Sequence, residues 1–468
     1  MRTALKGVLV LGVALLALAG AALVWLTPLS GRTPAEILRY VERRLDGHPR
    51  LEAAARPVLS VLKTHWAADD LQAQSVLFQV PPLPANPAML QSVSAGKASR
   101  DIQGQDQAGQ VIRVGPGRAI ARIADAARLA RDGDTIEIDP GDYAADVAVW
   151  DRARLTIRGV GPRVRLIAAG AIAEGKAIWV IRRGQVLIEG IEFIGARAGD
   201  LNGAGLRLEG GQLTVRRCLF YGNQTGILTG GGDQTSLLVE QSEFAYNGHG
   251  DGLSHHLYAG GLASLTVTGS YFHHANVGHH IKSRAARNRI AYNRLTDESG
   301  GQASYELEFP DGGVADVIGN VVQQSASTRN SAIISYGAEG LKWPHNALRL
   351  VHNTLVNDHP DGGTFVRVHG AVAEVLTRNN LFAGVGRWVV APDRPDSAGD
   401  AAVDWADLVR PSREDYRLNA RGRRRFEGIE SGAVDPRLKP QFEYVHPTGL
   451  SALSAAPMYP GALQSSGP

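Results

Sequence analysis

The sequence predicts an all-β solenoid, in which the chain winds into similar coils stacked along one axis. Glycine makes up 55 of the 468 residues, about 12% against a usual level near 7%, which indicates many turns and few long helices. Short apolar-x-apolar segments recur along the chain, and each is followed by an aromatic or aliphatic anchor and often by asparagine. Together these features favour stacked strands over a helical bundle.

The anchors of this repeat are separated by 27, 24, 28, 23, 26, 34 and 26 residues, which is the period of a coil with variable loops. They are Phe193, Phe220, Phe244, Phe272, Leu295, Val321, Leu355 and Leu381. The asparagines near them are expected to stack as side-chain ladders at the turns, which favours a structural role over a catalytic one. These are Asn223, Asn247, Asn276, Asn293, Asn320 and Asn353.

Residues 1–28 are predicted to be a signal anchor or transmembrane helix. Val8 to Leu26 is an unbroken apolar run of 19 residues, long enough to span a bilayer, and Arg2 and Lys6 precede it. This pattern predicts a single pass through the inner membrane, with the bulk of the chain in the periplasm or outside the cell. A cleaved signal peptide is the alternative, because small residues within the run could frame a cleavage site.

Residues 29–109 are predicted to be a helical and proline-rich spacer, with a partner-binding segment as the alternative. A capping-box start at Thr33 with proline at the first helical position begins a short helix, and the proline-rich linker starts at Val80. Residues 110–447 form the predicted solenoid domain, whose single amphipathic helix near the start is expected to cap the open coil end. Residues 448–468 are a C-terminal tail.

Charge and cysteine content exclude several classes of protein. The net charge is +3, from 49 basic and 46 acidic residues, and the basic residues are scattered, so no nucleic-acid partner is predicted. The only strongly basic run, Arg421 to Arg425, is short and is interpreted as a solvated turn. A single cysteine, Cys218, excludes an internal disulfide.

The stretch from His249 to Gly313 carries the candidate chemistry. Its runs HHLYA, HHIKSR and SYELEF repeat at 24 residues, so Tyr258, Lys282 and Glu306 are expected on successive rungs about 4.8 Å apart. If the leucine or isoleucine of each run points inward, strand alternation turns its polar neighbours outward. The predicted outward residues are His256, Tyr258, His280, Lys282, Arg284, Glu306 and Glu308.

Lys282 is singled out by composition. The chain has 42 arginines and 7 lysines, and Lys282 is the only lysine between Lys176 and Lys342. Lysine can act as a base where arginine stays charged, which favours a specific role for this residue. An ordinary ion pair with Glu306 on the next rung is the alternative.

From Gln110 to Tyr444 the chain resembles the right-handed parallel β-helix of the pectate-lyase-like superfamily. The resemblance is carried by DGDTIEIDPGDY from Asp132 to Tyr143, by the repeated Phe-x-x-Asn or Phe-x-x-x-Asn pattern, and by EYVHP from Glu443. It implies a fold that hosts lyases, epimerases, hydrolases and non-catalytic binders, so activity must be argued from the site.

Within that superfamily, lyases of the chondroitinase B and alginate lyase type are similar in using a lysine as base and an arginine as helper. The resemblance implies that Lys282 takes the proton next to a uronic carboxylate, that Arg284 neutralises this carboxylate, and that Tyr258 or His256 protonates the leaving oxygen. His280 belongs to the same catalytic group. If a glutamate beside Lys282 keeps it protonated, Lys282 becomes the neutraliser and a histidine or Tyr258 the base.

The expected substrate is an acidic, uronate-containing polysaccharide, and its predicted contacts are His255, Glu306, Glu308, Arg367 and His369. Epimerisation shares the first proton abstraction with elimination and stays open. Hydrolysis by Glu306, Glu308 or Asp311 and non-catalytic glycan binding are further alternatives. No cofactor is predicted, although calcium is possible at carboxylates on neighbouring rungs. Adjacent histidines point to opposite faces of a strand, so no histidine metal site is predicted.

Overall fold

The structure is a computed structural model of the chain and describes residues 78, 80–83, 109–298, 300–328, 330–427 and 433–465. The chain divides into two compact units, Met1–Gln79 and Val80–Pro468, and the fold below belongs to the second. The predicted anchor and most of the predicted spacer lie outside the described residues. Among the residues that are described, no helix combines the length and apolar character needed to cross a membrane.

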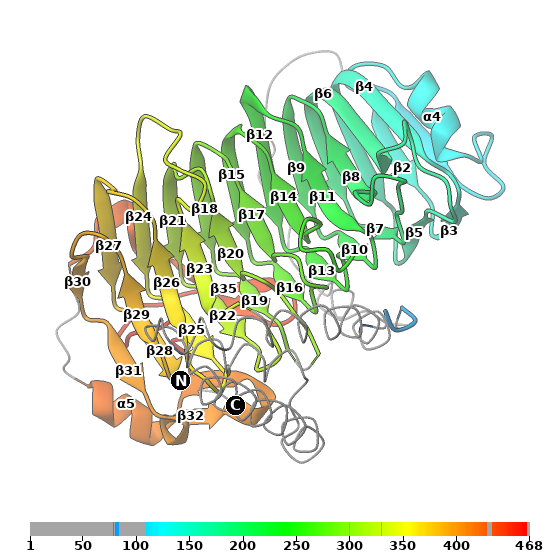
Figure 1. Cartoon of the computed structure of the whole chain (residues 1–468). Coiled ribbons are helices and arrows are strands. Elements are labelled where there is room, and N and C mark those ends of the chain that lie inside the picture. The colour runs from blue at the N-terminus through cyan, green and yellow to red at the C-terminus, as the bar shows by residue number, and fades with distance from the viewer. Residues whose placement is uncertain are drawn as a thin grey trace, which may run out of the picture. The chain divides into compact units, whose positions relative to one another are not determined.

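The second unit is the predicted all-β parallel solenoid, of the right-handed type and with about 10 turns (Figure 1). Each complete coil contributes one strand to each of three walls. The second wall is a separate 11-stranded sheet. It consists of β3 (Gly141–Ala144), β5 (Val164–Ile167), β7 (Ile191–Ile194), β10 (Leu219–Tyr221), β13 (Glu243–Ala245), β16 (Tyr271–His273), β19 (Arg294–Thr296), β22 (Val321–Gln324), β25 (Thr354–Asn357), β28 (Leu381–Gly384) and β31 (Ala401–Val403).

The first and third walls are joined into one 20-stranded sheet, because the long strands β4 (Ala148–Gly159) and β6 (Ala177–Glu189) run through both. The first wall continues with β1 (Val111–Val114), β2 (Thr135–Ile138), β9 (Gln212–Arg216), β12 (Gly232–Glu240), β15 (Leu262–Thr268), β18 (Arg287–Ala291), β21 (Val314–Ile318), β24 (Ala347–Val351), β27 (Glu374–Arg378) and β30 (Asp396–Ala398). The third wall continues with β8 (Ala204–Leu208), β11 (Thr225–Thr229), β14 (Leu257–Ala259), β17 (Ile281–Ser283), β20 (Leu307–Phe309), β23 (Ala332–Tyr336), β26 (Thr364–Val368) and β29 (Arg387–Val390).

Helices are few and short among the described residues. The predicted amphipathic helix near the start of the solenoid is α4 (Ile123–Leu129), which buries Ile123, Ala126 and Ala127 and lies beside β4 (Figure 1). Asp146 from the next turn of chain accepts hydrogen bonds from its first backbone N–H groups, at 2.7 and 3.0 Å. That this helix closes the coil end stays a prediction.

The C-terminal segment packs on the outer face of the second wall and against the ends of first-wall strands. It contains β32 (Leu408–Arg410), β33 (Asp415–Leu418), α5 (Ala420–Phe426), β34 (Phe442–Val445), β35 (Gly449–Ala452) and the short 3-10 helices Trp405–Asp407, Pro411–Arg413 and Pro436–Leu438. Its apolar side chains, among them Tyr416 and Phe426, form one cluster with outward residues of the second wall, among them Val321 and Leu381. The later strands of this wall are therefore buried on both faces.

The burial of both faces of these strands explains an error in the predicted repeat. The inward row contains Phe193, Phe220, Phe244, Phe272, Leu295 and Leu355, as predicted, but it has Val322 and Phe382 at the other two positions. Val321 and Leu381, the predicted anchors, are each one residue too early and point outward under the C-terminal segment. Where both faces of a strand are apolar, sequence alternation no longer identifies the inward residue.

Asparagine ladders hold the turns, as predicted. At the turn between the first and second walls, each amide Nδ2 donates to the Oδ1 of the next coil at 3.0 Å, through Asn293, Asn320, Asn353 and Asn380. A shorter ladder joins Asn223 to Asn247, also at 3.0 Å. Asn276 is half-buried and joins neither ladder. Every ladder amide also bonds to backbone groups of neighbouring coils, so these side chains replace solvent for buried peptide groups.

We expect Asn320→Ala to lower the free energy of unfolding by about 3 kcal/mol, because a buried N–H and carbonyl each lose a partner. Asn320 accepts from the backbone N–H of Asn293 at 2.9 Å and donates to the carbonyl of Ile290 at 2.8 Å. Asn276→Ala is the matched control and should cost less than about 1 kcal/mol. Urea denaturation followed by circular dichroism measures both; equal losses would contradict a specific role for the ladder.

Candidate active site

The predicted strip lies on the third wall, where β14, β17 and β20 pair in parallel. Leu257, Ile281 and Leu307 form one inward row, and Tyr258, Lys282 and Glu308 form the next row. The predicted pairing of Tyr258 with Lys282 is confirmed. The predicted pairing of Lys282 with Glu306 is wrong, since the coil between them is two residues longer than the repeat and brings Glu308 into register.

The outward side chains of this region form one ion-paired group, here called the outer strip: Tyr258, Lys282, Arg284, Glu308, Asp311 and Glu339. Lys282 Nζ lies 2.9 Å from Glu308 Oε2 and 3.3 Å from Glu339 Oε1, and the lysine side chain is only 14% exposed. The ion pair weighed from the sequence therefore exists, with Glu308 in place of Glu306. A lysine held between two carboxylates is an ion-pair partner in this structure and not a free base.

Arg284 connects the two ends of the outer strip. Its Nε donates to the hydroxyl oxygen of Tyr258 at 2.8 Å, its Nη1 lies 2.5 Å from Asp311, and its Nη2 lies 2.8 Å from Glu339 Oε2. Its carboxylate partners are thus Asp311 and Glu339. Glu308, which follows Arg284 by the 24-residue repeat, is not one of them. Glu339 comes from the loop between β23 and β24, and no repeat in the sequence connects that loop to the strip.

Two buried histidines support the outer strip from one side. His255 stacks on Tyr258 with ring centroids 5.6 Å apart, and its Nδ1 accepts a hydrogen bond from the backbone N–H of His279 at 3.0 Å. His279 Nε2 lies 2.9 Å from Glu308 Oε2. Burial, followed by the neighbouring His279 and the ammonium of Lys282, holds the pKa of His255 well below its usual value. A neutral ring that accepts at Nδ1 carries its proton on Nε2.

Glu308 is firmly ionised. Burial opposes its charge, but the hydrogen bond from His279 and the ammonium of Lys282 outweigh burial and lower its pKa to about 2. Glu308 therefore supplies negative charge to the outer strip and cannot hold a proton near neutral pH.

Three residues predicted to point outward point inward instead. His256, His280 and Glu306 are all 0% exposed. His256 and His280 stack on each other, with centroids 5.1 Å apart and planes 6° apart, but inside the coil. Each of the three immediately precedes its strand, at a corner where the backbone turns and strand alternation does not hold. The predicted outward orientation of these three side chains is therefore wrong.

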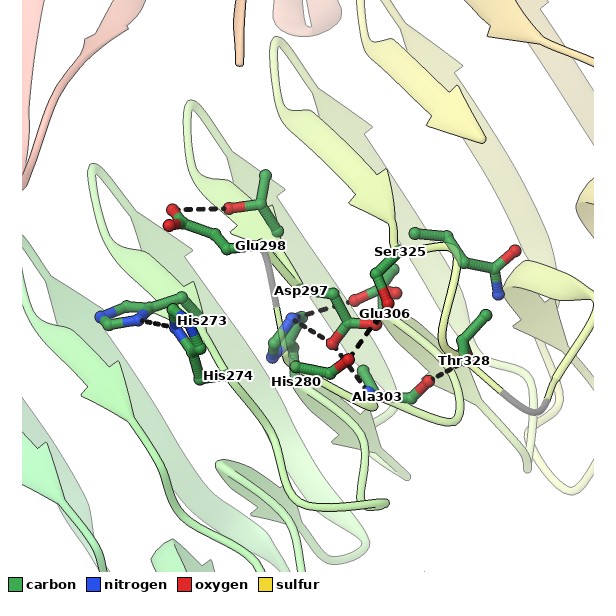
Figure 2. A network of polar contacts seen from close by, with 12 residues as sticks. His273, His274, His280, Asp297, Glu298, Ala303, Glu306, Ser325 and Thr328 are labelled. Carbon is green, nitrogen blue, oxygen red and sulfur yellow. Dashed lines mark hydrogen bonds and ion pairs between the residues drawn. The ribbon is translucent and has the colours of Figure 1, made fainter. Parts of the chain in front are cut away.

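Inside the coil, His280, Asp297 and Glu306 form a second polar group, here called the inner cluster (Figure 2). His280 Nε2 lies 2.9 Å from Glu306 Oε2 and 3.9 Å from Asp297 Oδ1. Burial, with a smaller contribution from Glu306, raises the pKa of Asp297 to about 8, and burial raises that of Glu306 well above its usual value. Burial also lowers the pKa of His280 to about 4. Sequence reasoning missed Asp297, which lies outside the three repeated runs.

The parallel winding of all three walls, one strand per wall in each complete coil, decides the fold. The chain is a parallel β-helix. Comparison with solved structures finds similarity to the pectate lyase Pel9A, at 13% identity over 77% of this chain and 97% of that chain, with a TM-score of 0.49. A Geobacillus virus E2 protein, ORF18, is similar at 15% identity over 58% of this chain and 53% of its own, with a TM-score of 0.36.

The PL6-family alginate lyase AlyGC is similar at 15% identity over 65% of this chain and 41% of its own, with a TM-score of 0.33. No protein-family model and no curated protein sequence matches the chain.

The row of the outer strip continues along the β-helix. Beyond Glu308 it passes through Ser335 to Arg367, two rungs away, and both lie on the third wall. Arg367 is half-buried and faces outward, as predicted, and His369, also half-buried, directly follows β26. That both residues contact a polymer lying across the rungs stays a prediction. Whether the carboxylates of the strip bind calcium stays a prediction.

A pocket of about 420 Å³ lies on the second wall of the β-helix, away from the predicted strip. Its lining includes three carboxylates and an indole from segments far apart in the sequence: Glu298, Asp358, Glu414 and Trp405. Ser325, also in the lining, donates to Asp297 Oδ2 of the inner cluster at 3.1 Å. No sequence motif connects these residues.

Proposed function

We propose that the β-helix is a polysaccharide lyase that cleaves a uronate-containing glycan by β-elimination at the outer strip. The observation that carries the proposal is the place of Glu339. Its carboxylate, on a side chain 44% exposed, bridges Lys282 Nζ and the Arg284 guanidinium. A uronate carboxylate that displaced Glu339 would meet two cations at once, beside the hydroxyl of Tyr258.

Elimination requires that the proton on C5 of the uronate becomes acidic, which happens when the neighbouring carboxylate is neutralised. Arg284 and Lys282 are positioned for this neutralisation. Glu308 and Glu339 hold Lys282 in ion pairs. Lys282 is therefore assigned as a neutraliser of the substrate carboxylate and not as the base. The base is then a different residue.

Tyr258 is assigned as the base and as the acid. Arg284 Nε donates to the phenolic oxygen and stabilises negative charge there. The phenolate takes the C5 proton, the C5–H electrons form the C4=C5 double bond, and the C4–O4 bond breaks. The departing O4 then receives the proton from the phenol, so atoms and charge balance. His255, with its proton on Nε2, is a hydrogen-bond donor to the substrate and not a base.

Hydrolysis is less favoured by this geometry. A glycosidase needs one protonated carboxyl group next to the scissile bond. Glu306 is enclosed in the coil, and Glu308 is ionised in two ion pairs. Epimerisation would use the same base and the same cations, and the products distinguish it from elimination. Export and single-pass anchoring through residues 1–28 belong to the proposal as well, as the route by which the enzyme meets an envelope or extracellular glycan.

The test is incubation of the purified protein with a panel of uronate-containing polymers, including the surface polysaccharide of the producing cell. We expect new ultraviolet absorbance from the C4=C5 double bond together with new reducing ends. Reducing ends without absorbance would assign a hydrolase, and a changed uronate composition without either would assign an epimerase. Binding without any product would overturn catalysis in favour of a glycan-binding protein.

A further inference from the structure

We propose that the inner cluster is a buried binding site for one divalent transition-metal ion, zinc in the first place, held by His280, Asp297 and Glu306. This site is distinct from the outer strip and from the calcium considered for its carboxylates. The three residues come from three places in the coil: the corner before β17, the end of β19 and the corner before β20. All three side chains are 0% exposed.

The distances within the inner cluster fit an ion. One ligand atom from each residue lies within 4.8 Å of the others. Zinc binds imidazole nitrogen and carboxylate oxygen at about 2.0–2.2 Å, which keeps neighbouring ligand atoms about 3 to 4 Å apart. The 2.9 Å from His280 Nε2 to Glu306 Oε2 and the 3.9 Å to Asp297 Oδ1 are close to that range.

The side chains converge without bonding one another. Among the described residues, neither carboxylate oxygen of Glu306 has an aligned hydrogen-bond partner, and the only hydrogen-bonding neighbour of the His280 ring is the backbone of Thr296. The 2.9 Å contact between them is close but not aligned as a hydrogen bond. Leaving such groups unpaired in a dry interior is costly, and a cation bound between them would remove that cost. Fully buried, unpartnered atoms that point into one space indicate a missing ligand.

The surroundings orient the third ligand. Asp297 Oδ1 accepts from the backbone N–H of Ala303 at 2.7 Å, and Oδ2 accepts from Ser325 Oγ at 3.1 Å (Figure 2). Hydrogen bonds of this kind fix metal-binding carboxylates in place. Ser325 also lines the 420 Å³ pocket on the second wall, whose three carboxylates attract cations. The pocket therefore lies one side chain away from the inner cluster.

The donor set selects the class of ion. One imidazole and two carboxylates suit zinc and its first-row neighbours, whereas calcium takes six to eight oxygen ligands. His256 is the matched control residue, because it is equally buried and stacks on His280 but bonds to Asn247 and to the carbonyl of His273 instead.

The experiment uses the full chain, refolded from denaturant with zinc, desalted and analysed for metal by mass spectrometry. We expect about one zinc per chain in the parent protein and in His256→Gln. Asp297→Asn and Glu306→Gln should retain less than a tenth of that amount. Cobalt in place of zinc should give visible absorption bands, and either metal should raise the melting temperature of metal-free protein.

If a variant does not fold, the metal content and melting temperature of the parent protein still test the proposal. Folded parent protein that retains less than a tenth of an equivalent of zinc, cobalt or manganese, with an unchanged melting temperature, would overturn the proposal. So would a folded Glu306→Gln variant with full metal content. None of these measurements depends on lyase activity, so the metal site and the proposed function fail or stand separately.

Discussion

Replacement of Arg284 by glutamine is expected to lower kcat/KM on the uronate polymer by about 10³-fold, or about 4 kcal/mol of transition-state stabilisation. The guanidinium is assigned two tasks: it neutralises the substrate carboxylate, and it donates to the Tyr258 oxygen at 2.8 Å. Glutamine keeps some hydrogen-bonding capacity and loses the charge. Steady-state rates of ultraviolet product formation measure the effect, with folding checked by circular dichroism.

Arg367→Gln is the matched control for this loss. Arg367 lies in the same row of the third wall, two rungs from Glu308, so it is placed to bind the polymer and not the reacting sugar. We expect a higher KM and a nearly unchanged kcat. The assignment would be contradicted if the Arg284 variant kept more than a tenth of the parent kcat/KM, or if both variants changed only KM.

How far the sequence predicts the site depends on how local each feature is. The pairing of Tyr258 with Lys282 follows from a 24-residue coil, and it is confirmed. The next coil carries two extra residues, so counting by 24 selected Glu306 where the structure has Glu308. A change in loop length leaves the apolar pattern of the strands intact, so the pattern alone cannot reveal the change.

Corners and distant loops limit prediction further. His256, His280 and Glu306 were assigned outward by extending strand alternation one residue past the strand, where the chain already turns inward. Glu339 reaches the outer strip from a loop that belongs to no repeat. The long-range meeting of such residues is fixed by the winding of the coils and not by any local motif.

The interior stack of aromatic rings provides the largest expected effect on stability. Phe244 lies between Phe220 and Phe272, with ring centroids 4.7 and 4.4 Å apart and planes within 11°. Phe244→Ala would remove a fully buried ring and both stacking contacts, and we expect a loss of about 3–5 kcal/mol in the free energy of unfolding. Phe244→Leu should lose less, because leucine fills most of the volume.

Trp388→Ala is the control at the surface. Trp388 stacks on Phe382 at 4.8 Å but is 39% exposed, so its loss should cost clearly less than that of Phe244. Urea denaturation gives both values. Because each coil contacts only its neighbours, the cavity at Phe244 should also weaken the coupling between the two halves of the stack. A lower m-value or a second transition for Phe244→Ala alone would show this, whereas equal losses for the two variants would mean that stacking between coils does not hold the solenoid together.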